Sequence, residues 1–179
     1  MSKLSKKKVI GITGSMGSGK SEISRYLRKK YPVLDCDQVN ADLLKKGNLG
    51  YQKLNDLRIV ELDSNGQIIK ESLASYMFSK AEHRKQVEAI LHPLIFEQMH
   101  KWICEQESSI VFVEMPILFE ISAQDHFDSI WCVVADLDVA LSRLQTYRNF
   151  TREQALARLV SQMNPEEKMA KSDIVLQNN

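Results

Sequence analysis

The sequence predicts an α/β fold, and three observations predict it. Residues 9–13 are a short apolar, β-branched run that leads into a glycine-rich segment and then into a helical pattern over residues 22–30. Similar runs, each short enough to be a buried strand, lie at residues 32–34, 110–113, 130–135 and 173–176. Residues 38–107 hold helical patterns and little sign of a further strand. Strands alternating with helices are typical of an α/β domain, and the strand-poor stretch predicts an inserted helical lobe.

The most specific motif follows the first strand directly. Residues 14–21 match the pattern G-x-x-x-x-G-K-[ST] of a phosphate-binding loop, between the strand and the helix that this motif requires. Its glycines let the backbone approach a ligand, and its N–H groups then face anionic oxygens at a helix N-terminus. Lys20 is expected to reach the terminal phosphates and the Ser21 hydroxyl to bind Mg²⁺, which argues against a glycine-rich turn that binds nothing. The residues expected to hold ATP here are Gly14, Ser15, Met16, Gly17, Ser18, Gly19, Lys20 and Ser21.

Composition sets further limits. The 179 residues suit one compact domain, and the formal net charge of +1 gives no field for non-specific binding to nucleic acid or membranes. The basic start is like that of a signal peptide, but the apolar run behind it stops at Gly14 and is too short for one. No apolar run reaches transmembrane length, so a cytoplasmic location with reduced cysteines is expected. The lysines of this basic start are Lys3, Lys6, Lys7 and Lys8.

Two aspartates follow the second predicted strand. Asp35 and Asp37 come after residues 32–34, and strand ends of this kind are where α/β folds bind ligands. A carboxylate here could position a substrate hydroxyl or a metal ion, or it could cap the helix predicted from about residue 39 to residue 45. We favour the functional role for Asp37 and leave both roles open for Asp35.

A third carboxylate, Glu114, follows the strand predicted at residues 110–113. An acidic side chain at the end of an apolar strand resembles the second nucleotide motif of P-loop proteins, where a carboxylate holds Mg²⁺, often through water. The alternative is a surface glutamate that follows an edge strand.

An arginine-rich segment has the composition that a kinase lid requires. A helix predicted over residues 137–144 is followed by a polar break at residues 146–150, and Thr151 with Gln154 forms a capping box for the next helix. The arginines around this break are Arg143, Arg148 and Arg152. For Arg152 we favour a solvated position on a charged helix.

Within the helical lobe, helices are predicted over residues 70–78 and 82–103. Pro93 is expected to kink or break the second of these helices. His92, beside it, could serve turn geometry or contact a substrate, although a histidine without a special role is the favoured interpretation.

Together the motifs resemble the dephospho-CoA kinase family. The loop reads GITGSMGSGKS, close to the family's GLTGGIGSGKS, and the family's LHPLI is unchanged at residues 91–95. Further segments are similar to its DAD, DIPLLFE, lid and closing motifs, at residues 35–37, 114–120, 151–162 and 172–178. These matches extend over nearly the whole chain, so together they are specific, whereas a phosphate-binding loop alone indicates only that phosphate is bound.

The resemblance implies transfer of the ATP γ-phosphoryl group to the ribose 3′-hydroxyl of dephospho-CoA, the last step of coenzyme A biosynthesis. It implies a three-layer αβα P-loop kinase fold with a five-stranded parallel sheet, a helical CoA lobe and a lid. The expected extents are one domain over 1–179, with a core at 8–37, 108–144 and 172–179, a lobe at about 38–107 and a lid at about 143–163. ATP and dephospho-CoA are the expected substrates and Mg²⁺ the expected cofactor. The protein is expected to be a monomer without nucleic-acid or membrane partners.

The resemblance also implies roles for single residues. The expected catalytic residues are Lys20, Asp37 and Arg148. Arg143 is expected to join the loop in binding ATP, and Ser21 with Glu114 is expected to hold Mg²⁺. Acceptor contacts are expected from Thr13, Asp37, His92, Pro93 and Leu118.

Three positions depart from the family's pattern. Glu114 stands where the family usually has Asp, and Tyr147 stands where it usually has a second lid arginine, with Arg148 one place along. The chain stops at Asn179, where members usually continue into a further helix. Two other functions stay open: another small-molecule P-loop kinase, such as a nucleoside monophosphate kinase, and a nucleotide-binding switch without transfer activity. The N-K-x-D motif that would favour a guanine-specific switch is absent from the sequence.

Overall fold

The computed structural model describes residues 7–179, so Lys3 and Lys6 of the basic start lie outside the described residues. The chain divides into two compact units. One unit combines the chain up to Leu34 with Gln106–Asn179, and the other is formed by Asp35–Glu105.

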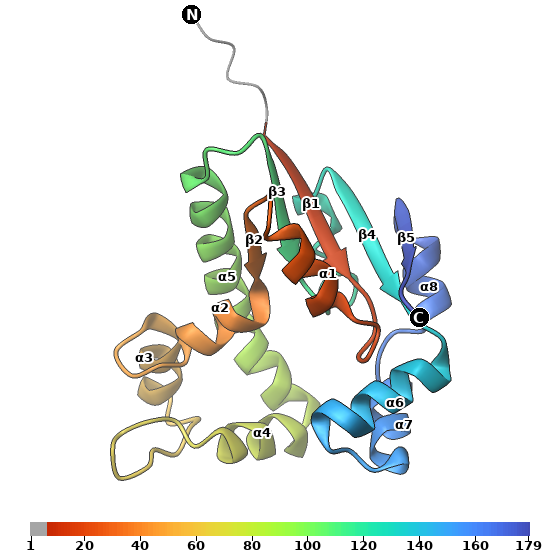
Figure 1. Ribbon diagram of the computed structural model, residues 1–179. Helices are drawn as coiled ribbons and strands as arrows, with labels where there is room; N and C mark the ends of the chain where they lie inside the picture. Colours follow the sequence, from red (N-terminus) through yellow and green to blue (C-terminus); the bar gives the residue numbers. More distant parts are fainter. Residues whose placement is uncertain (1–6) are drawn as a thin grey trace, which may run out of the picture. The chain divides into compact units, whose positions relative to one another are not determined.

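The first unit is built on a five-stranded sheet (Figure 1). Its strands are β1 (Lys8–Thr13), β2 (Val33–Asp35), β3 (Ile110–Glu114), β4 (Ser129–Val134) and β5 (Ile174–Gln177). They lie in the order β2-β3-β1-β4-β5, and β1 pairs in parallel with both β3 and β4, as β4 does with β5. The predicted α/β fold with a five-stranded parallel sheet is confirmed. In such a sheet the carboxyl ends of the strands meet at one edge, where ligands bind.

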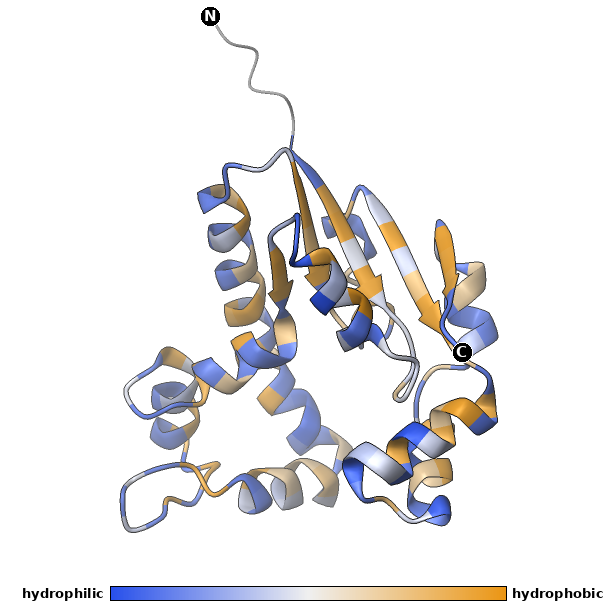
Figure 2. Cartoon of the chain, in the orientation of Figure 1, coloured by the Kyte–Doolittle hydropathy of each residue, from blue (hydrophilic) through white to orange (hydrophobic). Residues whose placement is uncertain are grey.

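Apolar strand residues form the core of this unit. Ile10, Ile12, Phe112 and Val133 are buried together, and Ile23 and Leu27 of the following helix pack against them. Figure 2 shows the strands largely in the colour of hydrophobic residues. Burial of these side chains holds the sheet and the first helix together, because about 25 cal/mol is gained for each Å² of apolar surface removed from water.

The helices of the first unit are α1 (Lys20–Leu27), α6 (Leu137–Arg148), α7 (Arg152–Val160) and α8 (Pro165–Ala170), with a 3₁₀ turn, η1, at Gln124–His126. The capping box of α7 is confirmed, because Thr151 and Gln154 bond each other's backbone N–H groups. The polar break is shorter than predicted, since α6 continues to Arg148 and ends where Asn149 adopts a left-handed conformation, φ 54°. Burial of Leu141 and Leu144 against α7 stabilises the longer helix.

The second unit contains α2 (Cys36–Leu43), α3 (Leu49–Asp56), α4 (Lys70–Ser79) and α5 (Ala81–Glu105). Residues 36–105 hold no strand, only an isolated bridge between Leu62 and Ile68. Helix α3 was not predicted, because its stretch of sequence has a weak pattern. The core of the second unit consists of Leu54, Ile59, Leu73, Val87 and Leu91.

Helix α5 continues through Pro93, so the predicted alternative of a break is wrong. Proline removes one helical hydrogen bond. Val87, Leu91 and Leu94 are buried on both sides of it, and their packing keeps the helix continuous. None of the helices in the described part of the chain has the length and apolar composition needed to cross a membrane.

Candidate active site

The phosphate-binding loop connects β1 to α1, and its glycines are required by both conformation and space. Gly14, Gly17 and Gly19 have φ values of 144°, 77° and 87°, where other residues are strained. A Cβ atom on Gly14 would lie 2.2 Å from the Val133 carbonyl oxygen, and one on Gly19 would lie 2.0 Å from Nδ2 of Asn178. Only glycine allows the loop to follow this path.

Lys20 and Ser21 begin α1, at the N-terminus of the helix that follows the loop. The Lys20 ammonium folds back over the loop and donates to the carbonyl oxygens of Gly14 at 2.8 Å and Ser15 at 2.9 Å. Ser21 is exposed. A cation held over a glycine-rich turn, beside the positive end of a helix dipole, forms a site suited to phosphate oxygens.

Arg143 and Asn178 support the loop from α6 and from the chain after β5. Nη1 of Arg143 donates to the Asn178 carbonyl oxygen at 2.8 Å and lies 3.5 Å from the Gly17 carbonyl oxygen. Nδ2 of Asn178 donates to the Ser18 carbonyl oxygen at 3.2 Å. The expected ATP-binding residue Arg143 therefore lies at the loop, together with Asn178, which was assigned no role.

Glu114 is buried at the end of β3, with 5% of its surface exposed. The alternative of a surface glutamate after an edge strand is wrong, because β3 lies between β2 and β1. Its carboxylate accepts a 2.5 Å hydrogen bond from the Ser24 hydroxyl of α1. This bond joins the end of β3 to the helix that carries Lys20 and Ser21.

The donor atoms suit a magnesium ion that accompanies a nucleotide. The Ser21 hydroxyl and the Glu114 carboxylate are hard oxygen ligands of the kind that Mg²⁺ prefers. Residues 7–179 contain no group of three or more His, Cys, Asp or Glu side chains that could hold a metal ion. Such a group is not required here, since Mg²⁺ at phosphoryl-transfer sites takes ligands from phosphates and water as well.

Thr13 and Leu118 are fully buried beside the loop. The Thr13 hydroxyl donates to the Pro116 carbonyl oxygen at 3.1 Å. The Leu118 side chain lies so close to Gly11 that a Cβ there would be 2.8 Å from its Cδ1 atom. Both side chains fix the segment after β3, and both residues are fully buried, backbone included.

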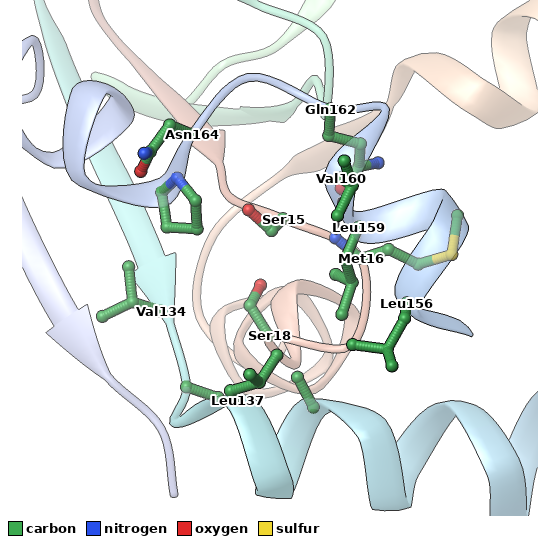
Figure 3. A pocket seen from close by; sticks show the side chains of 13 residues that line it. Ser15, Met16, Ser18, Val134, Leu137, Leu156, Leu159, Val160, Gln162 and Asn164 are labelled. Atoms are coloured by element: carbon green, nitrogen blue, oxygen red, sulfur yellow. Dashed lines mark hydrogen bonds between the residues drawn. The ribbon is translucent and has the colours of Figure 1, made fainter. Parts of the chain in front are cut away.

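A pocket of about 510 Å³ lies between the loop and the lid helix α7 (Figure 3). Figure 3 shows Ser15 and Ser18 between Val134 on one side and Leu156 and Leu159 on the other. The hydroxyls of both serines are buried and find no hydrogen-bond partner among residues 7–179. The pocket therefore has a mostly apolar wall, in which the two serine hydroxyls are buried.

Gln162, just after α7, connects the lid to the loop. Its Oε1 atom accepts a 2.9 Å hydrogen bond from the Met16 backbone N–H. Met16 also packs against the cluster of Leu141, Leu144 and Ala155 that joins α6 to α7. The lid helices and the phosphate-binding loop are thus in direct contact.

The lid arginines differ in their surroundings. Arg148 is exposed in the last turn of α6, next to the 78% exposed Tyr147. Arg152 is also exposed and lies 3.8 Å from Asp138, as expected for a solvated ion pair. Arg158 lies over the Phe150 ring, 4.6 Å from its centre.

The remaining expected residues belong to the second unit. Helix α2 begins at Cys36, three residues earlier than predicted, because the Asp35 carboxylate caps it by accepting from the backbone N–H groups of Asp37 at 2.9 Å and Gln38 at 3.2 Å. The capping role of Asp35 is therefore confirmed. Asp37 is exposed in the first turn of α2, and its catalytic role stays a prediction.

His92 and Pro93 lie within α5, so the proposed turn geometry at His92 is wrong. Burial lowers the pKa of the half-buried His92, against the opposing effect of Glu88, and Arg84 lowers it further. Pro93 is exposed. Their contact with an acceptor stays a prediction.

Three residues at this site were missed in the sequence. Gln162 and Asn178 lie within segments that resemble the family's lid and closing motifs. Their place in these motifs could have indicated a role at the site. Lys168 lies in a short helix that was not predicted, and neither spacing nor motif singles it out.

Comparisons with known proteins cover nearly the whole chain. A family model described as dephospho-CoA kinase matches residues 8–179. A dephospho-CoA kinase from Carboxydothermus hydrogenoformans is 34% identical over 175 residues, which are 95% of this chain and 85% of the relative. A crystal structure from Thermus thermophilus has a TM-score of 0.86 at 33% identity, over 97% of this chain and 89% of that one. The dephospho-CoA kinase structure from Campylobacter jejuni has a TM-score of 0.67 at 26% identity, with the same coverage. The chain belongs to the dephospho-CoA kinase family.

Proposed function

We propose that this protein is an enzyme that transfers the γ-phosphoryl group of ATP to the ribose 3′-hydroxyl of dephospho-CoA, giving coenzyme A. The observation that carries the proposal is the family match over residues 8–179 in a chain whose phosphate-binding loop has the required geometry. Phosphoryl transfer asks the protein mainly to position the two substrates and to stabilise charge. The loop and its surroundings supply groups for both tasks.

The loop would hold the ATP phosphates. Its backbone N–H groups and the N-terminus of α1 would face the β- and γ-phosphate oxygens, with the Lys20 ammonium as a positive charge beside them. Arg143 would support the nucleotide from α6. Mg²⁺, held by Ser21 and Glu114, would neutralise charge on the phosphates.

The acceptor would be bound by residues outside the loop. Asp37 would orient the 3′-hydroxyl and accept its proton, as a general base does. His92 and Pro93 would contact the acceptor, and the fully buried Thr13 and Leu118 would support the segment after β3 beside it. Arg148 would stabilise the charge that develops on the transferred group.

An acceptor panel tests the proposal. The purified protein is incubated with Mg-ATP and either dephospho-CoA, a nucleoside monophosphate or another small alcohol, and the products are identified by mass spectrometry. We expect rapid formation of coenzyme A, and loss of this activity in Lys20→Ala. Faster phosphorylation of a nucleoside monophosphate would contradict the assigned acceptor, and acceptor-independent turnover would favour a nucleotide switch.

The monomeric state and the cytoplasmic location expected from the sequence stay predictions. Light scattering on the purified protein tests the first, and imaging of the tagged protein in its own cells tests the second.

A further inference from the structure

Lys168 is buried without an assigned role. Among the Lys and Arg side chains of residues 7–179 it alone is buried, with 1% of its side chain exposed. Its ammonium lies 2.7 Å from Oε1 of Glu120 and donates to the Pro116 carbonyl oxygen at 2.9 Å. The Glu120 side chain is 25% exposed, and an ion pair with one buried partner contributes little net stability compared with apolar side chains of the same size.

The position of Lys168 links two parts of the sheet edge. The side chain comes from α8, which precedes β5, and reaches the segment after β3. The Pro116 carbonyl oxygen that it contacts also accepts from Thr13, the last residue of β1 before the loop. One carbonyl group thus receives bonds from the start of the phosphate-binding loop and from α8.

A second observation places Lys168 near strand β4. Burial raises the pKa of the Cys132 thiol in β4, and the positive charges of Lys168 and Lys20 both oppose the rise. Both lysines are therefore close enough to β4 for their charges to act on the Cys132 thiol. The Lys168 ammonium is enclosed and bonded to two oxygens, so it acts through its neighbours and not on a phosphate.

We propose that Lys168 is a positioning residue, which holds the segment 114–120 in register with the phosphate-binding loop through Pro116 and Glu120. This proposal rests on the proposed function, in which Thr13, Glu114 and Leu118 serve the acceptor and the metal. Helix α8 also carries Pro165, which lines the pocket beside α7. Loss of the ammonium would let the acceptor side of the site shift while the loop keeps its own contacts.

The test compares Lys168→Met with Lys171→Met. Lys171 is a control just past the end of the same helix, where it pairs with Glu167 at 2.8 Å and both side chains are about half exposed. We expect Lys168→Met to lower kcat/KM for dephospho-CoA about 10- to 100-fold, as loss of a supporting contact typically does. The affinity for ATP alone, measured by calorimetry, should change less than about threefold, because Lys20 and the loop are intact. Lys171→Met should stay within about twofold of wild type in kcat/KM for dephospho-CoA and in affinity for ATP, because exposed ion pairs contribute little.

Glu120→Gln makes the test independent of the folding of Lys168→Met. It keeps an oxygen for the hydrogen bond and removes the charge, so we expect a smaller loss of kcat/KM in the same direction. The double variant should lose no more than Lys168→Met alone, because the two groups act as a unit. Unchanged kcat and KM per folded molecule in Lys168→Met or in Glu120→Gln, or additive losses in the double variant, would overturn the proposal. Failure of the wild-type protein to phosphorylate dephospho-CoA would instead overturn the proposed function.

Discussion

Single side chains of the phosphate-binding loop have different duties. The glycines allow the backbone to pass where a Cβ atom would collide with Val133 or Asn178, and Lys20 supplies a positive charge beside the loop. Glu114, one strand away, is tied to α1 through Ser24. Geometry and charge at this site therefore depend on separate residues, which separate substitutions can address.

The first prediction compares Lys20→Ala with Asp37→Asn. A positioned general base contributes roughly 10²–10⁴-fold to the rate. In the proposed mechanism Lys20 stabilises charge on the transferred phosphate, so we expect Lys20→Ala to lower kcat/KM at least as much as Asp37→Asn does. Lys30→Ala, an exposed lysine just past α1, is the matched control. If Asp37→Asn keeps kcat within a few-fold of wild type, the assignment of the base is wrong.

The second prediction concerns the pH dependence of stability at His92. The folded protein lowers the pKa of His92 below its ordinary value of 6.5 through burial, so protonation favours the unfolded chain. The free energy of unfolding should fall as the pH drops through 6.5 towards the lower folded value. Denaturant unfolding between pH 8 and about pH 5 measures this slope.

His92→Gln should show a shallower slope than wild type, because it removes this titration. His100→Gln, at an exposed histidine on the same helix, is the control for replacing a histidine. Equal slopes in wild type and His92→Gln would contradict the prediction.

The predicted lid, formed by α6 and α7, carries Arg148, which we propose to stabilise the transferred group. Helices α6 and α7 pack through Leu141, Leu144 and Ala155, and Gln162 ties the end of α7 to Met16. Motion of the lid would therefore be transmitted to the loop.

The third prediction separates the lid arginines. Arg148→Ala should lower kcat by about 10³-fold or more, as expected for an arginine that stabilises the transferred group. Arg152→Ala should change it little, because its ion pair with Asp138 is exposed. Steady-state kinetics of both variants, measured side by side, decide the question. A large loss in Arg152→Ala with a small loss in Arg148→Ala would reverse the assignment.

The fourth prediction addresses Gln162. Gln162→Ala removes one hydrogen bond to the loop, which is typically worth about 0.5–1.5 kcal/mol. We expect the KM for ATP to rise about two- to tenfold, in line with that energy. Gln145→Ala, an exposed glutamine on α6, serves as the control. An unchanged KM for ATP in Gln162→Ala would show that the contact does not support the loop.

For the whole molecule, two-substrate transfer requires protection of bound ATP from water. Closure of the lid over the phosphates would exclude water, so ATP loss without acceptor should be slow. Phosphate release from Mg-ATP alone, compared with turnover in the presence of dephospho-CoA, measures this protection. Rapid hydrolysis without any acceptor would contradict the lid model.

Local sequence patterns were sufficient for much of this fold. The five strands, the loop and the capping box at Thr151 each depend on neighbours in sequence, so periodicity and motif predicted them. The length of α6, the unbroken α5 and the short α8 depend on packing instead. Burial around Pro93 outweighs its lost hydrogen bond, and no local pattern reports that balance.

The sequence by itself determined that the protein has a glycine-rich phosphate-binding loop on an α/β sheet, because that motif is continuous in the chain. Only the tertiary structure decided what surrounds the loop. Gln162 meets Met16 across 146 residues, Asn178 meets Ser18 across 160, and Lys168 meets Pro116 across 52. Contacts between such distant residues arise when helices and strands far apart in sequence pack around the same sheet. The side chains that brace the loop are therefore set by the order of the strands.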